Sequence, residues 1–377
     1  MATAKERFLL KDHLFNPEKI RRLAQEFGAG IPSFDGTRFE SEALAGFADR
    51  ELLQRLEWMA DCMERQLASD FPTMADQLEA AMPNMLNPTL SDDDFGHFIH
   101  AVPGILTVRH GLEDHRERSL DLLYEATKRF SMEFYIRPFL NRWPDETLAR
   151  LSLWAQDENY HVRRLVSEGT RPSLPWAKSV NLTQEQTIPF LDALHADIAR
   201  FVTRSVANHM NDISKINAET VILLLADWKK QGRQSVKELD WMTRHSLRTL
   251  VKQGHMGALE LLGYSKDVPI SVDAQILTPV VMMGDAVSFE ITISAQTQCP
   301  VLVDYRIEFA RAYGKRAEKV FKLKQAKVGP DAPLNLKKEH KLKADATTFT
   351  LFEGAHRITI QVNGVDHSVL DFQLTSN

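Results

Sequence analysis

The sequence predicts a mainly α-helical chain that ends in an all-β domain, and a change of pattern along the chain supports this prediction. Residues 1–266 carry apolar residues at helical spacing between short polar breaks. From about Lys266 onward, short strand-like runs alternate with turn signals such as Asn363-Gly364. We therefore expect a helical domain over residues 1–266 and a β-domain over residues 267–377.

Helix hairpins are predicted throughout the first domain. Asn16 and Pro17 begin a helix that should end near Gly28 and Gly30. Further helices are predicted over residues 43–67, 112–130, 144–154, 188–210 and 218–230, with another leading to Gly169. Hairpins of roughly 35 to 45 residues without an exact sequence repeat indicate a HEAT-like α-solenoid.

Three sets of polar residues are expected to cap helices. Residues 91–94, Ser-Asp-Asp-Asp, can cap a following short helix and place negative charge in its first turn. Thr183 with Gln186, and Ser235 with Glu238, both fit the capping box.

The second domain should hold about seven short strands, which suggests an immunoglobulin-like sandwich. Runs of strand character are seen at residues 281–283, 287–293, 301–309, 319–323, 349–352 and 357–362. Between Asp304 and Lys343 there are 12 Lys and Arg residues against 5 Asp and Glu residues. This basic stretch is either a nucleic-acid contact or, as at residues 337–341, a set of solvated strand edges.

The composition is that of an ordinary globular chain, with 377 residues of which 44% are hydrophobic and 26% charged. No apolar run reaches the roughly 18 residues of a membrane span, and the charged N-terminus lacks a signal-peptide core. Cys62 and Cys299 fall in different domains and are expected to be free thiols in a reducing compartment. We expect a monomer located in the cytoplasm.

Residues 127–176 concentrate the chemistry of the chain. Glu133 and Glu168 are 35 residues apart, close to one helix-pair repeat, so stacking should bring both to one face. Basic residues follow at His161, Arg163, Arg164 and Arg171. The pattern predicts two carboxylates on a concave, arginine-lined wall. His97, His100, His110 and His115 lack partners at metal-ligand spacing, so no metal site is predicted.

Three motifs resemble the AlkC family of bacterial DNA alkylation-repair glycosylases, which belongs with the AlkD enzymes in a HEAT-like superfamily. They are SxEFxIRPFL at residues 131–140, WAxDxNxHVRRLxSEGxRPxLPW at residues 154–176 and LRTLVKxGHxxALxLLGY at residues 247–264. KVFKLK at residues 319–324, with the Asn363-Gly364 hairpin, is similar to the immunoglobulin-like appendage that some members carry.

The resemblance implies cofactor-free excision of N3-alkylated bases, chiefly 3-methyladenine and 3-methylcytosine, from double-stranded DNA. The family's active-site residues would correspond to Glu133, Glu168 and Trp176, with Asp157 in the WAxD segment. An N3-alkylated adenine is cationic, so its departure leaves positive charge on the sugar. A carboxylate about 4 Å away is worth on the order of 4 kcal/mol at an effective dielectric near 20, roughly a thousandfold in rate.

Other roles for these residues remain open. Glu133 could be a carboxylate that favours a helix start, and Glu168 could pair with a neighbouring arginine. Trp176 could simply pack in a loop, and Asp157 could orient an arginine rather than act in catalysis.

Phosphate contacts are expected from ten basic residues in three groups. They are His161, Arg163, Arg164, Arg171 and Lys178; Arg244, Arg248 and Lys252; and Lys322 and Lys324. Because Arg163 and Arg164 point roughly 100° apart on a helix, we expect one to meet phosphate and the other to form a structural ion pair. The alternative functions are a non-catalytic binder of damaged or branched DNA and a protein-interaction scaffold.

Overall fold

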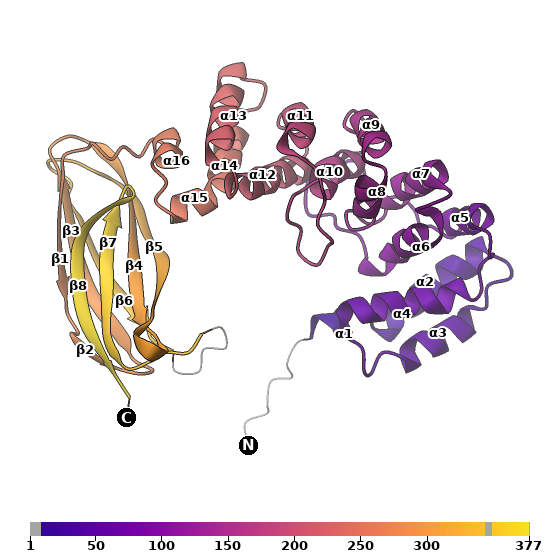
Figure 1. Cartoon of the computed structure of the whole chain (residues 1–377), viewed down its shortest axis with the longest axis horizontal. Helices are drawn as coiled ribbons and strands as arrows, with labels where there is room; N and C mark the ends of the chain where they lie inside the picture. The colour runs from indigo at the N-terminus through magenta and orange to yellow at the C-terminus, as the bar shows by residue number, and fades with distance from the viewer. Residues whose placement is uncertain (1–8, 344–348, 377) are drawn as a thin grey trace. The chain divides into compact units, whose positions relative to one another are not determined.

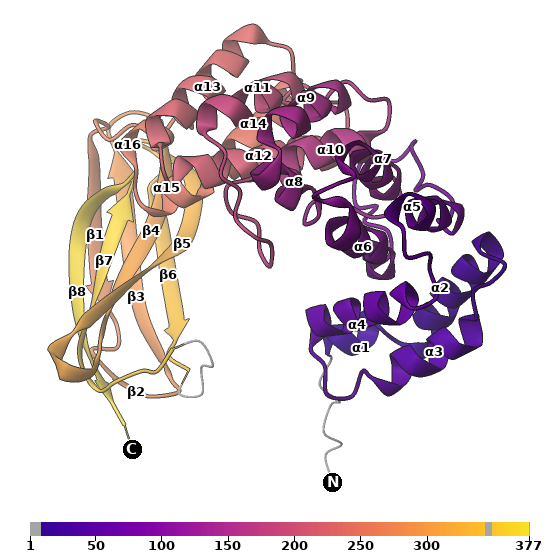
Figure 2. The ribbon, with the colours of Figure 1, turned by 45° about the vertical axis from the view of Figure 1, so that its right-hand side comes forward.

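A computed structural model describes residues 9–343 and 349–376 of the chain. Figures 1 and 2 show a helical part followed by a part made of strands. By contacts between Cα atoms, the chain forms two compact units. The first unit is Met1–Ile213 with Gly232–Met242, and the second is Ser214–Gln231 with Thr243–Asn377.

The first unit is a stack of antiparallel helices, in which neighbours along the chain pack against one another (Figure 1). Its helices are α1 (Leu10–Leu14), α2 (Pro17–Gly30), α3 (Gly36–Ala45), α4 (Leu52–Glu64), α5 (Phe71–Ala80), η1 (Phe98–Ala101), α6 (Val102–Gly111), α7 (Arg116–Thr127), α8 (Ile136–Arg142), α9 (Pro144–Trp154), α10 (Tyr160–Gly169), α11 (Gln184–Leu194), α12 (Arg200–Ser214) and the first part of α14 (Val236–Ser246). This is the HEAT-like architecture that the sequence predicts.

Helix α2 follows directly from its sequence. The Asn16 side chain accepts a hydrogen bond from the backbone N–H of Lys19, and Pro17 occupies the first helical position. Its apolar stripe is buried in the core of the first unit. Gly30 ends the helix against Ala80, where an added Cβ would lie 2.2 Å from the carbonyl oxygen. Glycine is therefore required for the close approach of α2 to the end of α5.

The predicted helices over residues 43–67 and 188–210 are each two helices in the structure. Gly46 separates α3 from α4 and lies against Trp58, where a Cβ would come within 2.2 Å of the indole nitrogen. Asp197 separates α11 from α12 by accepting a hydrogen bond from the backbone two residues later. In both places, a turn interrupts an apolar pattern that reads as continuous along the sequence.

The predicted caps have different outcomes. Gln186 accepts from the backbone N–H of Thr183 at 2.9 Å, so the capping box at the start of α11 is confirmed. At α14, Ser235 accepts from the backbone of Glu238 at 3.4 Å, but the Glu238 carboxylate binds Arg200 instead. The second capping box is therefore incomplete.

The acidic residues 91–94 do not begin a helix, contrary to prediction. They have no regular secondary structure, and η1 begins only at Phe98. The carboxylates of Asp92 and Asp93 bind the guanidinium group of Arg204 on α12. An arginine on another helix, rather than the backbone of the next turn, takes up their negative charge.

The second unit joins three helices to a β-sandwich. Helix α13 packs against α16, and α15 packs against strand β5. Its elements are α13 (Ala218–Gln231), α15 (Arg248–Lys252), α16 (Met256–Leu261), η2 (Ala312–Gly314), β1 (Ile270–Ile276), β2 (Val280–Met282), β3 (Ala286–Ala295), β4 (Cys299–Ala310), β5 (Arg316–Val328), β6 (Leu334–Lys341), β7 (Gly354–Val362) and β8 (Val365–Thr375). The strands begin at Ile270, but the compact unit begins earlier because these helices pack with the sandwich.

Two sheets form the sandwich, with strand orders β1-β3-β6 and β2-β8-β7-β4-β5. Buried and exposed residues alternate along β3 and β8, as expected for strands with one face in a core. Asn363 and Gly364 both adopt positive φ angles and join β7 to β8, which confirms the predicted hairpin. The register of β4 against β5 shifts between Val303 and Asp304, which marks a β-bulge.

One strand prediction is wrong. Residues 349–352 form no strand, although Phe349 and Leu351 pack on the sandwich core. Residues 337–341, for which solvated strand edges were one interpretation, belong to β6, the edge strand of the three-stranded sheet, which pairs with β3. Along β6, Lys337 and Lys341 are exposed, while Lys338 is partly buried.

Cys62 and Cys299 are both buried free thiols, as predicted. Among the described residues, no helix combines the length and the apolar character needed to cross a bilayer. The described residues also contain no group of three His, Cys, Asp or Glu side chains arranged to hold a metal ion.

Candidate active site

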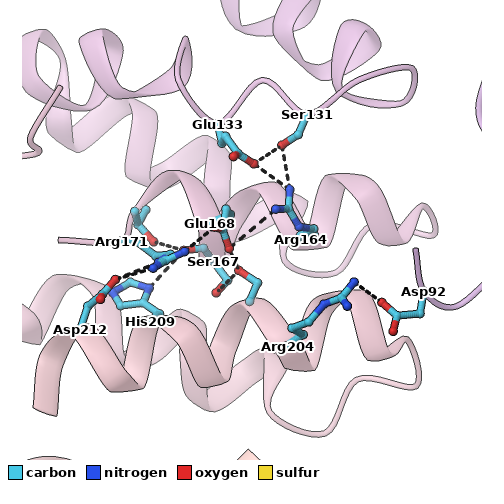
Figure 3. A network of polar contacts seen from close by, with 12 residues as sticks. Asp92, Ser131, Glu133, Arg164, Ser167, Glu168, Arg171, Arg204, His209 and Asp212 are labelled. Atoms are coloured by element: carbon cyan, nitrogen blue, oxygen red, sulfur yellow. Dashed lines mark hydrogen bonds and ion pairs between the residues drawn. The ribbon is translucent and has the colours of Figure 1, made fainter. Parts of the chain in front are cut away.

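Glu133 and Glu168 converge on one arginine, Arg164 (Figure 3). Glu133 lies in the turn that leads into α8, while Arg164 and Glu168 are one helical turn apart on α10. Arg164 Nη1 lies 2.8 Å from Glu133 Oε2, and Nη2 lies 3.9 Å from Glu168 Oε2. Stacking of successive helix pairs thus brings the two glutamates to the same guanidinium group.

Glu133 is held through one of its two oxygens. Ser131 Oγ donates to Glu133 Oε2 at 2.7 Å, and Arg164 donates to the same oxygen. Within residues 9–343 and 349–376, no donor reaches Oε1. The side chain is 17% exposed. Glu133 is therefore fixed in place with one oxygen still available to a ligand.

Glu168 is buried and has partners on both oxygens. Its side chain is 6% exposed; Oε1 binds Arg171, and Oε2 accepts from Ser205 Oγ at 2.6 Å. Burial alone would raise the pKa of Glu168, but the charges of Arg164 and Arg171 outweigh it and hold this pKa below its usual value. Glu168 is therefore an ionised carboxylate enclosed by the protein.

The network continues into α12 through residues that the sequence analysis did not single out. Arg171 Nη2 lies 2.8 Å from the Asp212 carboxylate, and Ser205 donates to Glu168. Ser205 lies 37 residues after Glu168, and Asp212 lies 41 residues after Arg171. These separations resemble the 35-residue spacing of the two glutamates, so searching one repeat further could have found both residues.

His209 and Arg137 complete the surroundings of the network. Burial lowers the pKa of His209 to about 4, so its ring is neutral at pH 7, with Nδ1 beside the carbonyl oxygen of Ser167. Arg137 is fully buried and donates to the carbonyl oxygens of Gly169 and Arg171. It thereby ties the loop after α10 to α8.

The basic residues of α10 and its following loop form ion pairs within the protein or are uncharged. Arg163 binds both carboxylate oxygens of Asp197, at 2.6 and 2.9 Å. Burial lowers the pKa of His161 to about 4, so this ring carries no charge for a phosphate at pH 7. Arg164 and Arg171 bind the network carboxylates. At these four positions, carboxylates of this chain or burial neutralise the side chains in this structure, and phosphate contacts there stay a prediction.

Asp157 is joined to other partners. It accepts a hydrogen bond from the Tyr124 hydroxyl at 2.7 Å and another from the backbone of Asn159 at 2.8 Å. Asn159 in turn caps α10. Among the described contacts of Asp157, none is to Glu133 or Glu168. These contacts favour a structural role for Asp157, in which it positions the Asn159 cap at the start of α10.

Trp176 lies in an exposed turn. Its side chain is 66% exposed, and its φ angle of 66° is in the left-handed region. It lines a groove of about 260 Å³ together with Phe134, Tyr135 and Lys178. Phe134 and Tyr135 directly follow Glu133 in the chain. The structure therefore brings Trp176 to the segment that carries the more exposed glutamate.

A second cluster of predicted residues lies within the second unit. Arg244, Arg248, Lys252 and Lys322 line one cavity of about 190 Å³ together with Asp304. The bulge in β4 is at Asp304, whose carboxyl group is buried. Burial raises the pKa of Asp304 to about 6, although Lys322 opposes this shift. Lys324 is exposed further along β5 and is not among the residues lining the cavity.

Comparisons with known proteins match the whole chain. Residues 271–376 match the family described as "Uncharacterised protein YhaZ, C-terminal Ig-like domain". The chain is 30% identical to the "Uncharacterized protein YhaZ" of Bacillus subtilis over 96% of this chain and 98% of that protein. It is 32% identical to the Pseudomonas fluorescens alkylpurine DNA glycosylase AlkC, solved bound to DNA containing an abasic site analog. That match has a TM-score of 0.84 and covers 98% of this chain and 100% of the other.

Proposed function

This chain belongs to the AlkC family, and from that premise we propose that it is a monofunctional DNA glycosylase. Its substrates are N3-alkylated bases, such as 3-methyladenine and 3-methylcytosine, in double-stranded DNA. The reaction hydrolyses the bond between the base and the deoxyribose and uses no cofactor. The family relationship supports the reaction class, and the geometry around Glu133 supports the mechanism.

The single observation that supports the mechanism is the way the Glu133 carboxylate is held. Ser131 and Arg164 fix one carboxylate oxygen, while the other has no donor within the described part of the chain. A cationic base leaves without being protonated, so the enzyme needs negative charge beside the sugar rather than a general acid. Glu133 supplies that charge and orients the attacking water through its second oxygen.

Glu168 acts from deeper in the protein. Its hydrogen bonds with Ser205 and Arg171 leave little room for direct contact with a sugar. It adds negative potential and balances Arg164, which would otherwise neutralise Glu133 more strongly. Trp176 offers its exposed ring to the cationic base or sugar, a contact worth about 0.5 to 2 kcal/mol. We assign Asp157 to positioning α10.

The basic cavity of the second unit supplies the sequence-independent part of DNA binding. Arg244, Lys252 and Lys322 can neutralise backbone phosphates, which gives affinity without base recognition. This suits an enzyme that must inspect DNA of any sequence. We expect the enzyme to work as a monomer in the cytoplasm.

Glu133→Gln tests the mechanism because it keeps the shape of the side chain and removes its charge. We expect single-turnover release of 3-methyladenine from duplex DNA to slow by roughly a thousandfold, the value of one well-placed carboxylate. DNA affinity should change little, since Glu133 is not a phosphate contact. Release of 3-methylcytosine by the same variant, measured in parallel, shows whether both bases depend on this residue.

Glu238→Gln is a matched control. Glu238 is 16% exposed, close to the 17% of Glu133, and likewise binds an arginine, Arg200. This variant should retain excision within about threefold when folded protein is compared, because it removes an ion pair outside the site. Equal rates for Glu133→Gln and the unsubstituted protein would rule out the mechanism. DNA binding without base release by the unsubstituted protein would instead favour the non-catalytic DNA binder.

A further inference from the structure

The acidic segment, residues 91–95, is docked on helix α12. The carbonyl oxygen of Ser91 accepts a hydrogen bond from the backbone N–H of Phe201, in the first turn of α12. Asp92 binds Arg204, one turn further along (Figure 3), and Asp93 binds the same guanidinium group. The Phe95 ring meets the Phe201 ring edge-on, with 5.0 Å between centroids. Backbone, carboxylates and an aromatic ring of the segment therefore all contact the same helix.

This contact is next to the candidate active site. The Phe201 ring, which contacts Phe95, also contacts Arg164. The guanidinium group of Arg164 lies over this ring, with its central carbon 4.4 Å from the ring centroid. The guanidinium group of Arg204 lies 5.6 Å from the same centroid. Arg164 binds Glu133, so one aromatic ring separates the acidic segment from the network that holds the more exposed glutamate.

Arg204 differs from Arg163 and Arg171 in the kind of segment that carries its carboxylate partners. Arg163 and Arg171 bind carboxylates carried by helices or short helix turns of the stack. Arg204 binds two consecutive aspartates of a segment without regular secondary structure, and Asp93 is held there at a φ angle of 62°. A non-glycine residue in this region is strained. The segment also leaves Phe95 largely exposed, so little burial supports this conformation.

Two buried polar groups beside the segment have no partner. The Tyr160 hydroxyl and His161 Nε2 are both enclosed and make no hydrogen bond in the described structure. Both side chains are more than nine-tenths buried, and the Tyr160 ring lies 6.0 Å from the Phe201 ring. Asp94 is close enough to influence the charge state of both residues. Buried polar atoms without a hydrogen-bond partner are rare, and each calls for an explanation.

Carboxylates bound to an arginine at the start of a helix resemble a phosphate in charge and in hydrogen-bond geometry. We propose that Arg204, the first turn of α12 and the Tyr160–His161 pair form a binding subsite for a DNA backbone phosphate. In the protein without DNA, the acidic segment occupies this subsite and must leave it when DNA binds. The inference rests on the proposed function in taking DNA as the ligand, but its readout is binding and not base release.

The competition has a defined signature in salt dependence. Displacing Asp92 and Asp93 exposes two carboxylates that take up cations, which offsets the cations released when Arg204 meets a phosphate. Neutralising both aspartates removes this offset. Asp92→Asn/Asp93→Asn should therefore bind an undamaged duplex about tenfold more tightly and steepen the slope of log K against log salt by about one. Fluorescence anisotropy of a labelled duplex across a salt series measures both quantities.

Asp94→Asn is the control within the same segment. It makes the same kind of charge change, but Asp94 is not an ion-pair partner of Arg204 in the described structure. It should shift affinity by less than about threefold, the effect of one nearby charge in salt. Arg204→Gln should weaken binding by about tenfold and make the slope shallower by about one. Combining Arg204→Gln with Asp92→Asn/Asp93→Asn should abolish most of the gain that the double substitution gives alone.

The proposal is overturned if the double variant leaves the slope of log K against log salt unchanged, or if its gain in affinity survives in the Arg204→Gln background. Hydrogen exchange of unsubstituted protein gives a second test that does not depend on variants. DNA should accelerate exchange in the acidic segment, and unchanged protection there would also overturn the proposal. Release of the alkylated base is measured separately from DNA binding. Binding that follows this cycle without release contradicts only the proposed function, while release without the cycle contradicts only the subsite.

Discussion

The arginines of the helical stack and the basic cavity of the second unit differ in how their charge is balanced. In the stack, Arg164 and Arg171 bind carboxylates of their own chain and are almost fully enclosed. In the second unit, Lys252 and Lys322 are exposed at a cavity whose lining contains one carboxyl group, that of Asp304. The sequence predicts all four basic residues as phosphate contacts, yet Arg164 and Arg171 form ion pairs inside the helical stack.

The charge balance of the two regions differs because the helical stack has acidic residues one repeat away from its arginines. Arg163 finds Asp197 34 residues later, and Arg171 finds Asp212 41 residues later, because stacked helix pairs place such positions side by side. The stretch from Asp304 to Lys343 has 12 basic and 5 acidic residues, so many of its cations have no carboxylate to meet. A basic residue in a solenoid is therefore a candidate for DNA contact only after its neighbours one repeat away have been checked.

Among the variants that test this comparison, Arg171→Met is expected to have the largest effect. It leaves Glu168 and Asp212 buried without their shared cation, and breaking a buried ion pair costs about 3 to 5 kcal/mol. We expect the helical unit to lose stability by this amount in urea unfolding followed by far-ultraviolet circular dichroism. The second unit should unfold at an unchanged urea concentration.

Arg38→Met provides the matched control. Arg38 binds Glu42 one helical turn away at the surface of α3, so Arg38→Met should lower stability far less than Arg171→Met. A loss below about 1 kcal/mol for Arg171→Met would mean that the network is not a structural element, and Arg171 would again become a candidate for phosphate binding.

Lys252→Gln/Lys322→Gln tests the other side of the comparison. If both lysines meet phosphates, the slope of log K against log salt should fall by about 1.8, and affinity at moderate salt should drop by about thirtyfold or more. Stability should hardly change, because both side chains are exposed. A salt titration of duplex binding measures the slope directly.

The control for the lysine pair is Lys229→Gln/Lys230→Gln. These two lysines are exposed at the end of α13 in the same unit, and they do not line the cavity. Equal losses for the two double variants would show that the unit binds DNA through its overall charge. A loss confined to Lys252 and Lys322 would identify the cavity as the contact.

Architecture could be predicted from local patterns, since periodicity and turn residues act over a few positions. The α2 start at Asn16 and the Asn363-Gly364 hairpin are set by the chemistry of adjacent residues, and both were predicted correctly. The break at Gly46 was missed because the close approach of Trp58 arises only when α4 folds back against the end of α3, which periodicity does not show.

The candidate site was predictable only in part, and for the same reason. The 35-residue spacing predicted that Glu133 and Glu168 would approach each other, and both reach Arg164. No local pattern shows that Arg164 lies between them or that Ser205 reaches Glu168 from α12. Charge partners separated by 30 to 40 residues can be assigned only once the stacking of the helices is known.

Asp304→Asn is expected to have the smallest effect. It replaces the one carboxyl group among the residues that line the basic cavity. Burial raises the pKa of Asp304 to about 6 from an unfolded value near 3.8, so the folded state holds a proton that the unfolded state releases. The stability contributed by Asp304 is therefore fully present below pH 3.8 and lost as pH rises through 6. At pH 8, Asp304→Asn should stabilise the second unit by about 1 to 2 kcal/mol.

Urea unfolding of the second unit between pH 4 and pH 8 measures this effect, with Asp273→Asn, an exposed carboxylate on β1, as control. The gain from Asp304→Asn should vanish toward pH 4, while Asp273→Asn should have no such pH dependence. His340, whose pKa burial lowers to about 4, titrates in an overlapping range with the opposite sign, so the comparison must be with unsubstituted protein at each pH. If the gain is the same at pH 4 and pH 8, Asp304 is ionised throughout, and the cavity is then balanced by an internal carboxylate as the helical network is.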